Sequence, residues 1–209
     1  MRFGIICEGF TDKPTIKNIL CGYFSIQNPN SEIAELQPPF GQTDGGGWRP
    51  LLQYLTSLRF QEDVLNNEFV ILHIDTDVSM DFNVPHIDSI GNELSVEILV
   101  QNISHKLIAK INEGLLDFYS DNANKIIFAI SVHSIECWLV AYYAEHAEIH
   151  NCFDVLRAVK LPNNIQVSKK QRTYDTLSKP FLNPDNINIV AQKSPSFNLF
   201  IQQLHTITL

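Results

Sequence analysis

Several features that mark other classes of protein are missing from this sequence of 209 residues. It has no run of 18 or more apolar residues, so we expect no transmembrane helix. Its first residues lack a basic region followed by a long apolar stretch, so we expect no signal peptide. Internal repeats and low-complexity segments are also missing. These absences favour a globular protein that has no contact with a membrane.

Charged residues are scarce as well. They make up 18% of the chain, too few for a disordered protein, whereas apolar residues at 44% can supply a sizeable core. The formal net charge is -8, from 15 basic and 23 acidic residues, which argues against binding nucleic acid by charge alone. Contact with nucleic acid through bound metal ions stays open, because bound cations invert the local field.

Cysteine is infrequent and forms no C-x-x-C pair. The four cysteines are Cys7, Cys21, Cys137 and Cys152, and the first and third lie in apolar runs. We interpret all four as reduced core thiols of a cytoplasmic protein.

Strand-like and helix-like patterns alternate over the first two thirds of the chain. We expect strands over residues 3–7, 32–37, 68–74 and 125–132, and helices over 12–24, 49–58, 94–116 and from 134 onward. The third strand, "EFVILHI", is almost continuously apolar, as a central parallel strand should be. This order predicts an α/β fold with a mostly parallel sheet of about four strands and helices on both faces.

The pattern changes after about residue 150. Short polar segments rich in Asn, Lys and Pro appear, with helices expected over 169–177 and 195–206. We therefore divide the chain into an α/β domain, residues 1–150, and a helical C-terminal extension, residues 151–209, packed on it.

Acidic residues follow three of the four predicted strands. Glu8 follows the first strand, Asp75 and Asp77 follow the third, and the fourth leads to Glu136. Because the carboxyl ends of parallel strands meet at one edge of a sheet, these acids can converge. Gathered carboxylates repel one another unless cations join them, and their oxygens suit Mg²⁺ or Mn²⁺. Such ions can activate water and stabilise the leaving oxygen in phosphodiester cleavage.

Each acid taken alone also has a structural interpretation. Thr11 or Asp12 could cap the first helix, and one of Asp75 and Asp77 could be a turn residue. Glu136 lies in the first turn of a predicted helix, where the dipole favours a carboxylate. Acids after three different strands are harder to explain by chance.

Four short motifs carry a resemblance to a known family. "EGFTD" after the first strand and "DTD" after the third resemble the two motifs of the Toprim domain, which occurs in topoisomerases, primases and the overcoming-lysogenisation-defect (OLD) nucleases. "SIECWLVAYY" and "KSPSF" further along resemble small bacterial Toprim-like proteins near the OLD and RloB types. The resemblance covers most of the chain. It implies a Toprim-like, Rossmann-like fold and a metal-dependent nuclease.

The resemblance also implies roles for individual residues. The catalytic residues would be Glu8, as metal ligand or general base, with Asp75 and, by its position in the C-terminal part, Lys193. The ligands of Mg²⁺ or Mn²⁺ would be Glu8, Asp12, Asp75, Asp77 and Glu136.

Partners follow from the same resemblance. It implies DNA or RNA as substrate, a role in anti-phage defence in the cytoplasm, and no membrane, and it leaves a homo-oligomer open. "GQTDGGGW" lacks the Gly-Lys-Ser/Thr ending of a phosphate-binding loop, so any ATPase must be a separate chain. The same stretch could bind a phosphate through backbone amides beside Arg49, or be a plain loop, with even odds.

Two other functions compete with the nuclease. "HIDTDVS" resembles the D-x-D-x-T signature of haloacid dehalogenase-type phosphatases, with Asp75 as nucleophile. That signature normally lies on the first strand, and it would leave Glu8 unexplained. The other alternative is a non-catalytic Toprim-like binding or regulatory subunit of a defence complex, against which the intact acids count.

Overall fold

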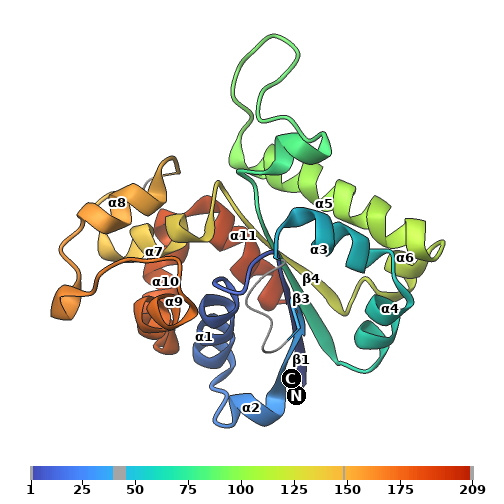
Figure 1. The fold of residues 1–209 in the computed structure, drawn as a ribbon, viewed down its shortest axis with the longest axis horizontal. Coiled ribbons are helices and arrows are strands. Elements are labelled where there is room, and N and C mark those ends of the chain that lie inside the picture. The colour runs from blue at the N-terminus through green and yellow to red at the C-terminus, as the bar shows by residue number, and fades with distance from the viewer. Residues whose placement is uncertain (1, 40–45, 148, 208–209) are drawn as a thin grey trace.

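The sheet is parallel throughout. The computed structural model describes residues 2–39, 46–147 and 149–207, and "GQTDGG" lies almost wholly outside them. Its strands are β1 (Phe3–Cys7), β2 (Ile33–Gln37), β3 (Phe69–Asp75) and β4 (Ile126–Ser131), in the order β2-β1-β3-β4. The predicted four-stranded α/β fold is confirmed, with every strand within two residues of its expected bounds (Figure 1).

Helices cover both faces of this sheet. One face carries α1 (Lys13–Phe24), α7 (Ile135–Tyr143), α8 (Cys152–Ala158), α9 (Gln171–Ser178), α10 (Pro184–Lys193) and α11 (Pro195–Leu204). The other carries α3 (Trp48–Leu55), α4 (Leu58–Leu65), α5 (Val96–Gly114) and α6 (Phe118–Asn122). Shorter helical segments are the α-helix α2 (Pro29–Glu32) and the 3₁₀ helices η1 (Ser79–Phe82), η2 (Pro162–Asn164) and η3 (Lys179–Leu182). The two groups of helices lie left and right of the sheet in Figure 1.

The strands β1, β3 and β4 are almost continuously apolar because both of their faces are buried. Ile5 and Ile71 point toward α1 and α7, whereas Ile6 and Leu72 point toward α3 and α5. This two-sided burial explains the near-continuous apolar runs.

The last helix is built into the same core. Trp138 of α7 stacks on Phe200 of α11 with ring centroids 5.7 Å apart, and its Nε1 donates to Ser196 Oγ at 2.9 Å. Gln203 exchanges two hydrogen bonds with the backbone of Phe128 on β4, at 3.0 and 2.9 Å. The C-terminal helices therefore pack into the cluster that also holds α1 and α7, and Gln203 occupies backbone groups at the outer edge of β4.

Some predicted helix bounds are wrong. The helix expected over 49–58 ends at Leu55, and a second helix, α4, follows. Ser57 starts that second helix, because its side chain accepts a hydrogen bond from the Phe60 amide at 3.2 Å. The helices α6, α8 and α10 were not expected at all. None of the helices in the described residues is long and apolar enough to cross a membrane.

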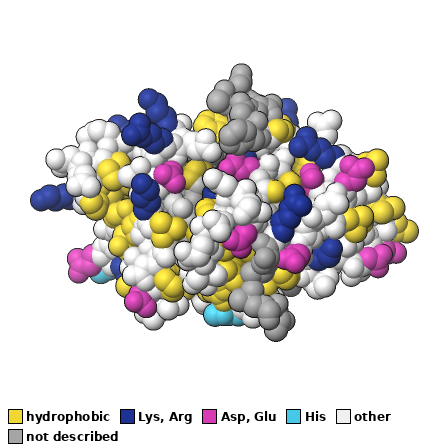
Figure 2. All heavy atoms as spheres, turned by 90° about the horizontal axis from the view of Figure 1, so that it is seen from below, with side chains coloured by type: hydrophobic (Ala, Val, Ile, Leu, Met, Phe, Trp, Pro, Cys, Tyr) yellow, Lys and Arg dark blue, Asp and Glu magenta, His cyan; other side chains and the backbone are white. Residues whose placement is uncertain are grey.

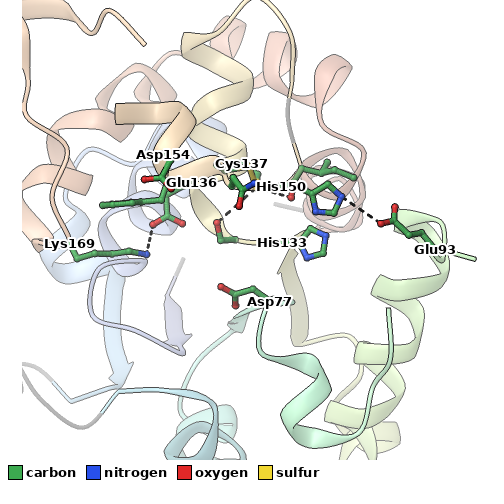
Figure 3. A pocket seen from close by; sticks show the side chains of 13 residues that line it. Asp77, Glu93, His133, Glu136, Cys137, His150, Asp154 and Lys169 are labelled. Atoms are coloured by element: carbon green, nitrogen blue, oxygen red, sulfur yellow. Dashed lines mark hydrogen bonds and ion pairs between the residues drawn. A yellow bond between two sulfur atoms is a disulfide. The ribbon is translucent and has the colours of Figure 1, made fainter. Parts of the chain in front are cut away.

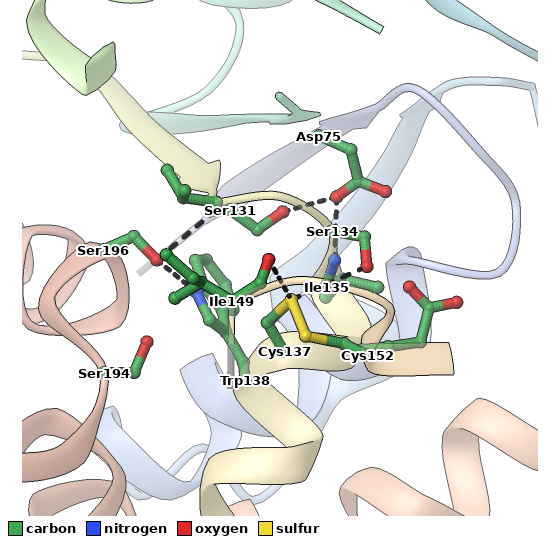
Figure 4. Close-up of a disulfide and its surroundings, with 12 residues drawn as sticks. Asp75, Ser131, Ser134, Ile135, Cys137, Trp138, Ile149, Cys152, Ser194 and Ser196 are labelled. Atoms are coloured by element: carbon green, nitrogen blue, oxygen red, sulfur yellow. Dashed lines mark hydrogen bonds between the residues drawn. A yellow bond between two sulfur atoms is a disulfide. The ribbon is translucent and has the colours of Figure 1, made fainter. Parts of the chain in front are cut away.

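The prediction of four reduced thiols is wrong for one pair. Cys137 and Cys152 form a disulfide with their Cα atoms 5.0 Å apart, whereas Cys7 and Cys21 are free and buried. The bond joins α7 to the first residue of α8 (Figure 4). After α7 the chain reverses, so that α8 packs against α7. No local sequence pattern predicts this reversal.

We expect this disulfide to stabilise the fold measurably. Replacing Cys137 and Cys152 together by Ala should lower the free energy of unfolding by about 3 kcal/mol, because the bond closes a 15-residue separation in the unfolded chain. Urea unfolding of both proteins measures the difference. Cys21→Ala, which removes a buried free thiol, is the control, and a double variant no less stable than Cys21→Ala contradicts the prediction.

Candidate functional site

Strand register brings the acidic residues to one edge of the sheet. Asp75 ends β3 on the side that faces α1 and α7, and it pairs in register with Ser131 at the end of β4. Glu8 follows the last residue of β1, the other neighbour of β3. Asp12, the residue before α1, and Glu136, in the first turn of α7, lie at the same edge.

Asp75 is held by donors from the neighbouring strand and helix. Its Oδ1 accepts hydrogen bonds from Ser131 Oγ and from the Ile135 amide, the latter at 2.9 Å (Figure 4). Ile135 is the first residue of α7, so the carboxyl group caps that helix. Burial raises the pKa of Asp75 well above its usual range, and the charges of Asp12, Glu136 and Glu8 raise it further. A role as a turn residue therefore does not account for the burial and the raised pKa of Asp75.

Asp12 occupies the first position before α1 but makes no capping bond to it. Its Oδ2 accepts from the Gly9 amide at 2.9 Å, and its Oδ1 accepts from Thr11 Oγ1 at 3.2 Å. Burial raises the pKa of Asp12 to about 7, and the charge of Glu136 acts in the same direction. Asp12 is thus the N-cap residue by position, but its side chain does not cap α1, because it turns back into the loop after β1.

His73 lies between two of these acids without neutralising them. Its Nδ1 is 3.7 Å from Asp12 Oδ2, and its Nε2 is 3.5 Å from Asp75 Oδ1 and 3.0 Å from Ser131 Oγ. Burial lowers the pKa of His73 to about 3, so the ring is neutral at neutral pH and these contacts are not ion pairs.

Glu8 is the acid with the least support from its surroundings. Burial raises its pKa to about 8, and the charges of Asp12 and Asp77 contribute. Its Oε2 is buried and has no hydrogen-bond partner within the described part of the chain. Asp77 lies nearer to solvent, and partial burial and the charge of Glu136 raise its pKa as well.

Glu136 is the exception in this cluster. Its Oε1 accepts from Lys169 Nζ at 2.6 Å (Figure 3) and also from the Tyr174 hydroxyl. Burial acts to raise the pKa of Glu136, but these two hydrogen bonds outweigh it and the pKa is lowered. Glu136 is therefore ionised beside a cation.

The lysine beside the acids is not the one suggested by the sequence. Lys193 donates to the Ala144 carbonyl at 3.0 Å, at the C-terminal end of α7. That end lies about 12 Å from Glu136 at 1.5 Å per residue. Lys169 occupies the site instead. Its sequence context, "SKKQR", indicates only a small basic cluster.

Five acids thus influence one another: Glu8, Asp12, Asp75, Asp77 and Glu136. Within the described residues, no three His, Cys, Asp or Glu side chains are arranged to hold a metal ion as they stand. The reason is that three of the carboxyl groups are turned toward protein donors. The unpartnered Glu8 oxygen and four raised pKa values nevertheless fit a divalent cation, which would relieve the repulsion.

Comparison with known proteins adds no assignment, since no family model, curated protein or solved structure matches the chain. The fold and the site define an α/β protein with a four-stranded parallel sheet and a carboxylate cluster at the strand ends.

Without metal, we expect stability to fall as pH rises from 7 to 9. Glu8, with a folded-state pKa of about 8, keeps a proton that the unfolded chain has already lost, so the folded state binds more protons in this window. One such proton changes the free energy of unfolding by at most about 1.4 kcal/mol per pH unit. The window avoids His73 and His133, which are neutral when folded and titrate below it when unfolded.

Urea unfolding in EDTA at pH 7, 8 and 9 tests this. Glu8→Gln should make the slope shallower without abolishing it, because the raised pKa values of Asp75 and Cys7 act in the same direction. Glu62→Gln, at an exposed position on α4, should leave the slope unchanged. Stability that rises over this window, or a slope unaffected by Glu8→Gln, contradicts the assignment of the raised pKa.

Proposed function

We propose that this chain is a metal-dependent nuclease that hydrolyses phosphodiester bonds. The observation that carries the proposal is the cluster at the ends of β1, β3 and β4, where acids share a buried edge and one Glu8 oxygen has no hydrogen-bond partner among the described residues. Burying such a cluster is costly without cations. Carboxyl groups with strongly perturbed pKa values concentrate at functional sites, so we favour a catalytic role.

The ion would be Mg²⁺ or Mn²⁺, held by Glu8, Asp12, Asp75 and Asp77, with Glu136 at the border of the site. When bound, it would activate water and stabilise the leaving oxygen. These ligands are oxygen donors of the kind that both ions prefer.

The protein's own residues supply the remaining chemistry. Once it has lost its proton, the Glu8 carboxylate can serve as a ligand or as the base that accepts a proton from an attacking water. Ser131 and the Ile135 amide fix the orientation of Asp75. Lys169 brings a positive charge to the acidic edge, and in this proposal it takes the part that the resemblance gave to Lys193.

The motifs that resemble the Toprim domain support the same proposal, because "EGFTD" and "DTD" follow two adjacent strands. We extend it, on that resemblance, to anti-phage defence with DNA or RNA as substrate and a separate ATPase as partner. On the face seen in Figure 2, basic and acidic side chains are interspersed, which does not favour broad electrostatic binding there. Nucleic acid would instead approach the acidic edge through bound cations.

Cleavage should require Mg²⁺ or Mn²⁺ and should be lost when a ligand is removed. Asp75→Asn keeps an oxygen for Ser131 and Ile135, so the fold should survive while cleavage falls by about a hundredfold or more. Glu8→Gln should behave in the same way. The assay uses plasmid, single-stranded DNA and RNA, each with Mg²⁺, Mn²⁺ or chelator.

Asp81→Asn is the matched control, since Asp81 is an exposed acid of η1 close in sequence to Asp77. It should cleave like the wild type. Hydrolysis of a small phosphomonoester that Glu8→Gln retains in full and Asp75→Asn abolishes would favour the phosphatase. No cleavage of any substrate with either metal would favour the non-catalytic subunit.

Metal binding should also be visible without turnover. Millimolar Mg²⁺ should raise the melting temperature of the wild type, because the ion binds the folded cluster and not the unfolded chain. In chelator, Glu8→Gln should melt no lower than the wild type, since it replaces a carboxyl group whose charged form is disfavoured by burial and by its acidic neighbours. A melting temperature that Mg²⁺ leaves unchanged, or raises equally in Glu8→Gln, counts against the metal site.

A further inference from the structure

A cavity of about 630 Å³ opens beside the carboxylate cluster. Asp77, Glu136 and Lys169 line it on one side, and their side chains point into the same space (Figure 3). Phe153 of α8 lines it as well. The volume lies in the range of roughly 300–1,000 Å³ that small-ligand sites occupy. The cavity can therefore hold part of a substrate that reaches the acids.

The Phe153 ring is flanked by two cations. Lys169 Nζ lies 5.0 Å from the ring centroid, and the Arg157 guanidinium carbon lies 5.8 Å from it. The ring is half-buried, and the side chains of Lys169 and Arg157 are 62% and 60% exposed, so an incoming ligand can reach all three. Lys169 is also paired with Glu136 at 2.6 Å and Arg157 with Asp154 at 3.7 Å, so a base that stacks on the ring would displace one cation from it. An aromatic face with cations beside it is the combination that binds single-stranded nucleic acid, with the base on the ring and the phosphate near the cations.

The position of this ring relative to the acids is fixed covalently. Phe153 follows Cys152, whose disulfide to Cys137 ties α8 to the first turn of α7. Glu136 is the residue before Cys137. The fully buried Leu156 anchors the same short helix to the core. A ring held in this way need not be ordered when the ligand binds, which favours affinity.

We propose, resting on the nuclease function above, that the substrate is single-stranded nucleic acid and that an unpaired base stacks on Phe153. Its neighbouring phosphate would lie near Lys169, at the border of the carboxylate cluster. Bases inside a duplex are covered by their neighbours and do not offer a free face to a side chain. The stacking surface is shared by DNA and RNA, so both are arms of the test.

Binding is measured by fluorescence anisotropy with labelled 12-nucleotide oligothymidine, oligouridine and a blunt DNA duplex, with Ca²⁺ in place of Mg²⁺. Phe153→Leu keeps an apolar side chain but loses the flat ring, and it should weaken single-strand binding by about 5- to 140-fold. Phe153→Trp keeps a stacking surface and should bind within about threefold of the wild type, the scatter expected when a stacking surface is kept. Leu65→Ala removes an apolar side chain that is 60% exposed on α4, across the sheet, and should have no effect.

The outcomes separate this inference from the function on which it rests. Wild-type affinity in Phe153→Leu, equal or tighter binding of the duplex, or no binding by the wild type overturns the stacking site. Metal-dependent cleavage that Phe153→Leu leaves intact keeps the nuclease and removes the inference. Phe153-dependent binding without cleavage in Mg²⁺ or Mn²⁺ removes the nuclease. Thermal melts confirm that each variant is folded.

Discussion

Repulsion among carboxylates at the buried end of the sheet is the constraint on which the rest of the structure depends. Burial alone favours the neutral form of Glu8, Asp12 and Asp75, and each further charge strengthens that preference. His73 cannot relieve it, because burial keeps the ring neutral. Glu136 alone is compensated by the protein, through Lys169 and Tyr174. The fold therefore holds a site whose charge is reduced by protons unless, as we propose, a cation binds there.

The C-terminal part of the chain completes this site and does not merely cover the sheet. Both donors to Glu136 come from it, Lys169 from the segment before α9 and Tyr174 from α9 itself. Ser196 holds Trp138, which lies on the same helix as Glu136, and the ring of Trp138 also meets His73 edge-on at 5.9 Å. The core that joins the last helices to α7 thus also fixes the acidic edge.

The sequence was informative where local pattern decides structure. Uninterrupted apolar runs ending in an acid located β1 and β3 and correctly placed Glu8 and Asp75 at the strand ends. It was uninformative where partners meet only in the fold. Lys169 sits in a polar segment far from Glu136 in sequence, and nothing local distinguishes it from Lys193. The disulfide and α8 could not be predicted for the same reason, since both depend on the reversal of the chain after α7.

The negative net charge of the chain is compatible with a nucleic-acid substrate if the substrate approaches through bound cations. With a net charge of -8 and acids gathered at the cavity, the metal-free edge repels a phosphate backbone, apart from the positive charge of Lys169. In the proposed function, a bound divalent ion would reverse the local field, so that cation and nucleic acid would each favour the binding of the other. Reciprocal coupling of this kind requires a fixed position of Lys169 and Phe153 relative to the acids. The bond between Cys137 and Cys152 constrains this arrangement, because it joins the helix that carries Glu136 to the helix that carries Phe153.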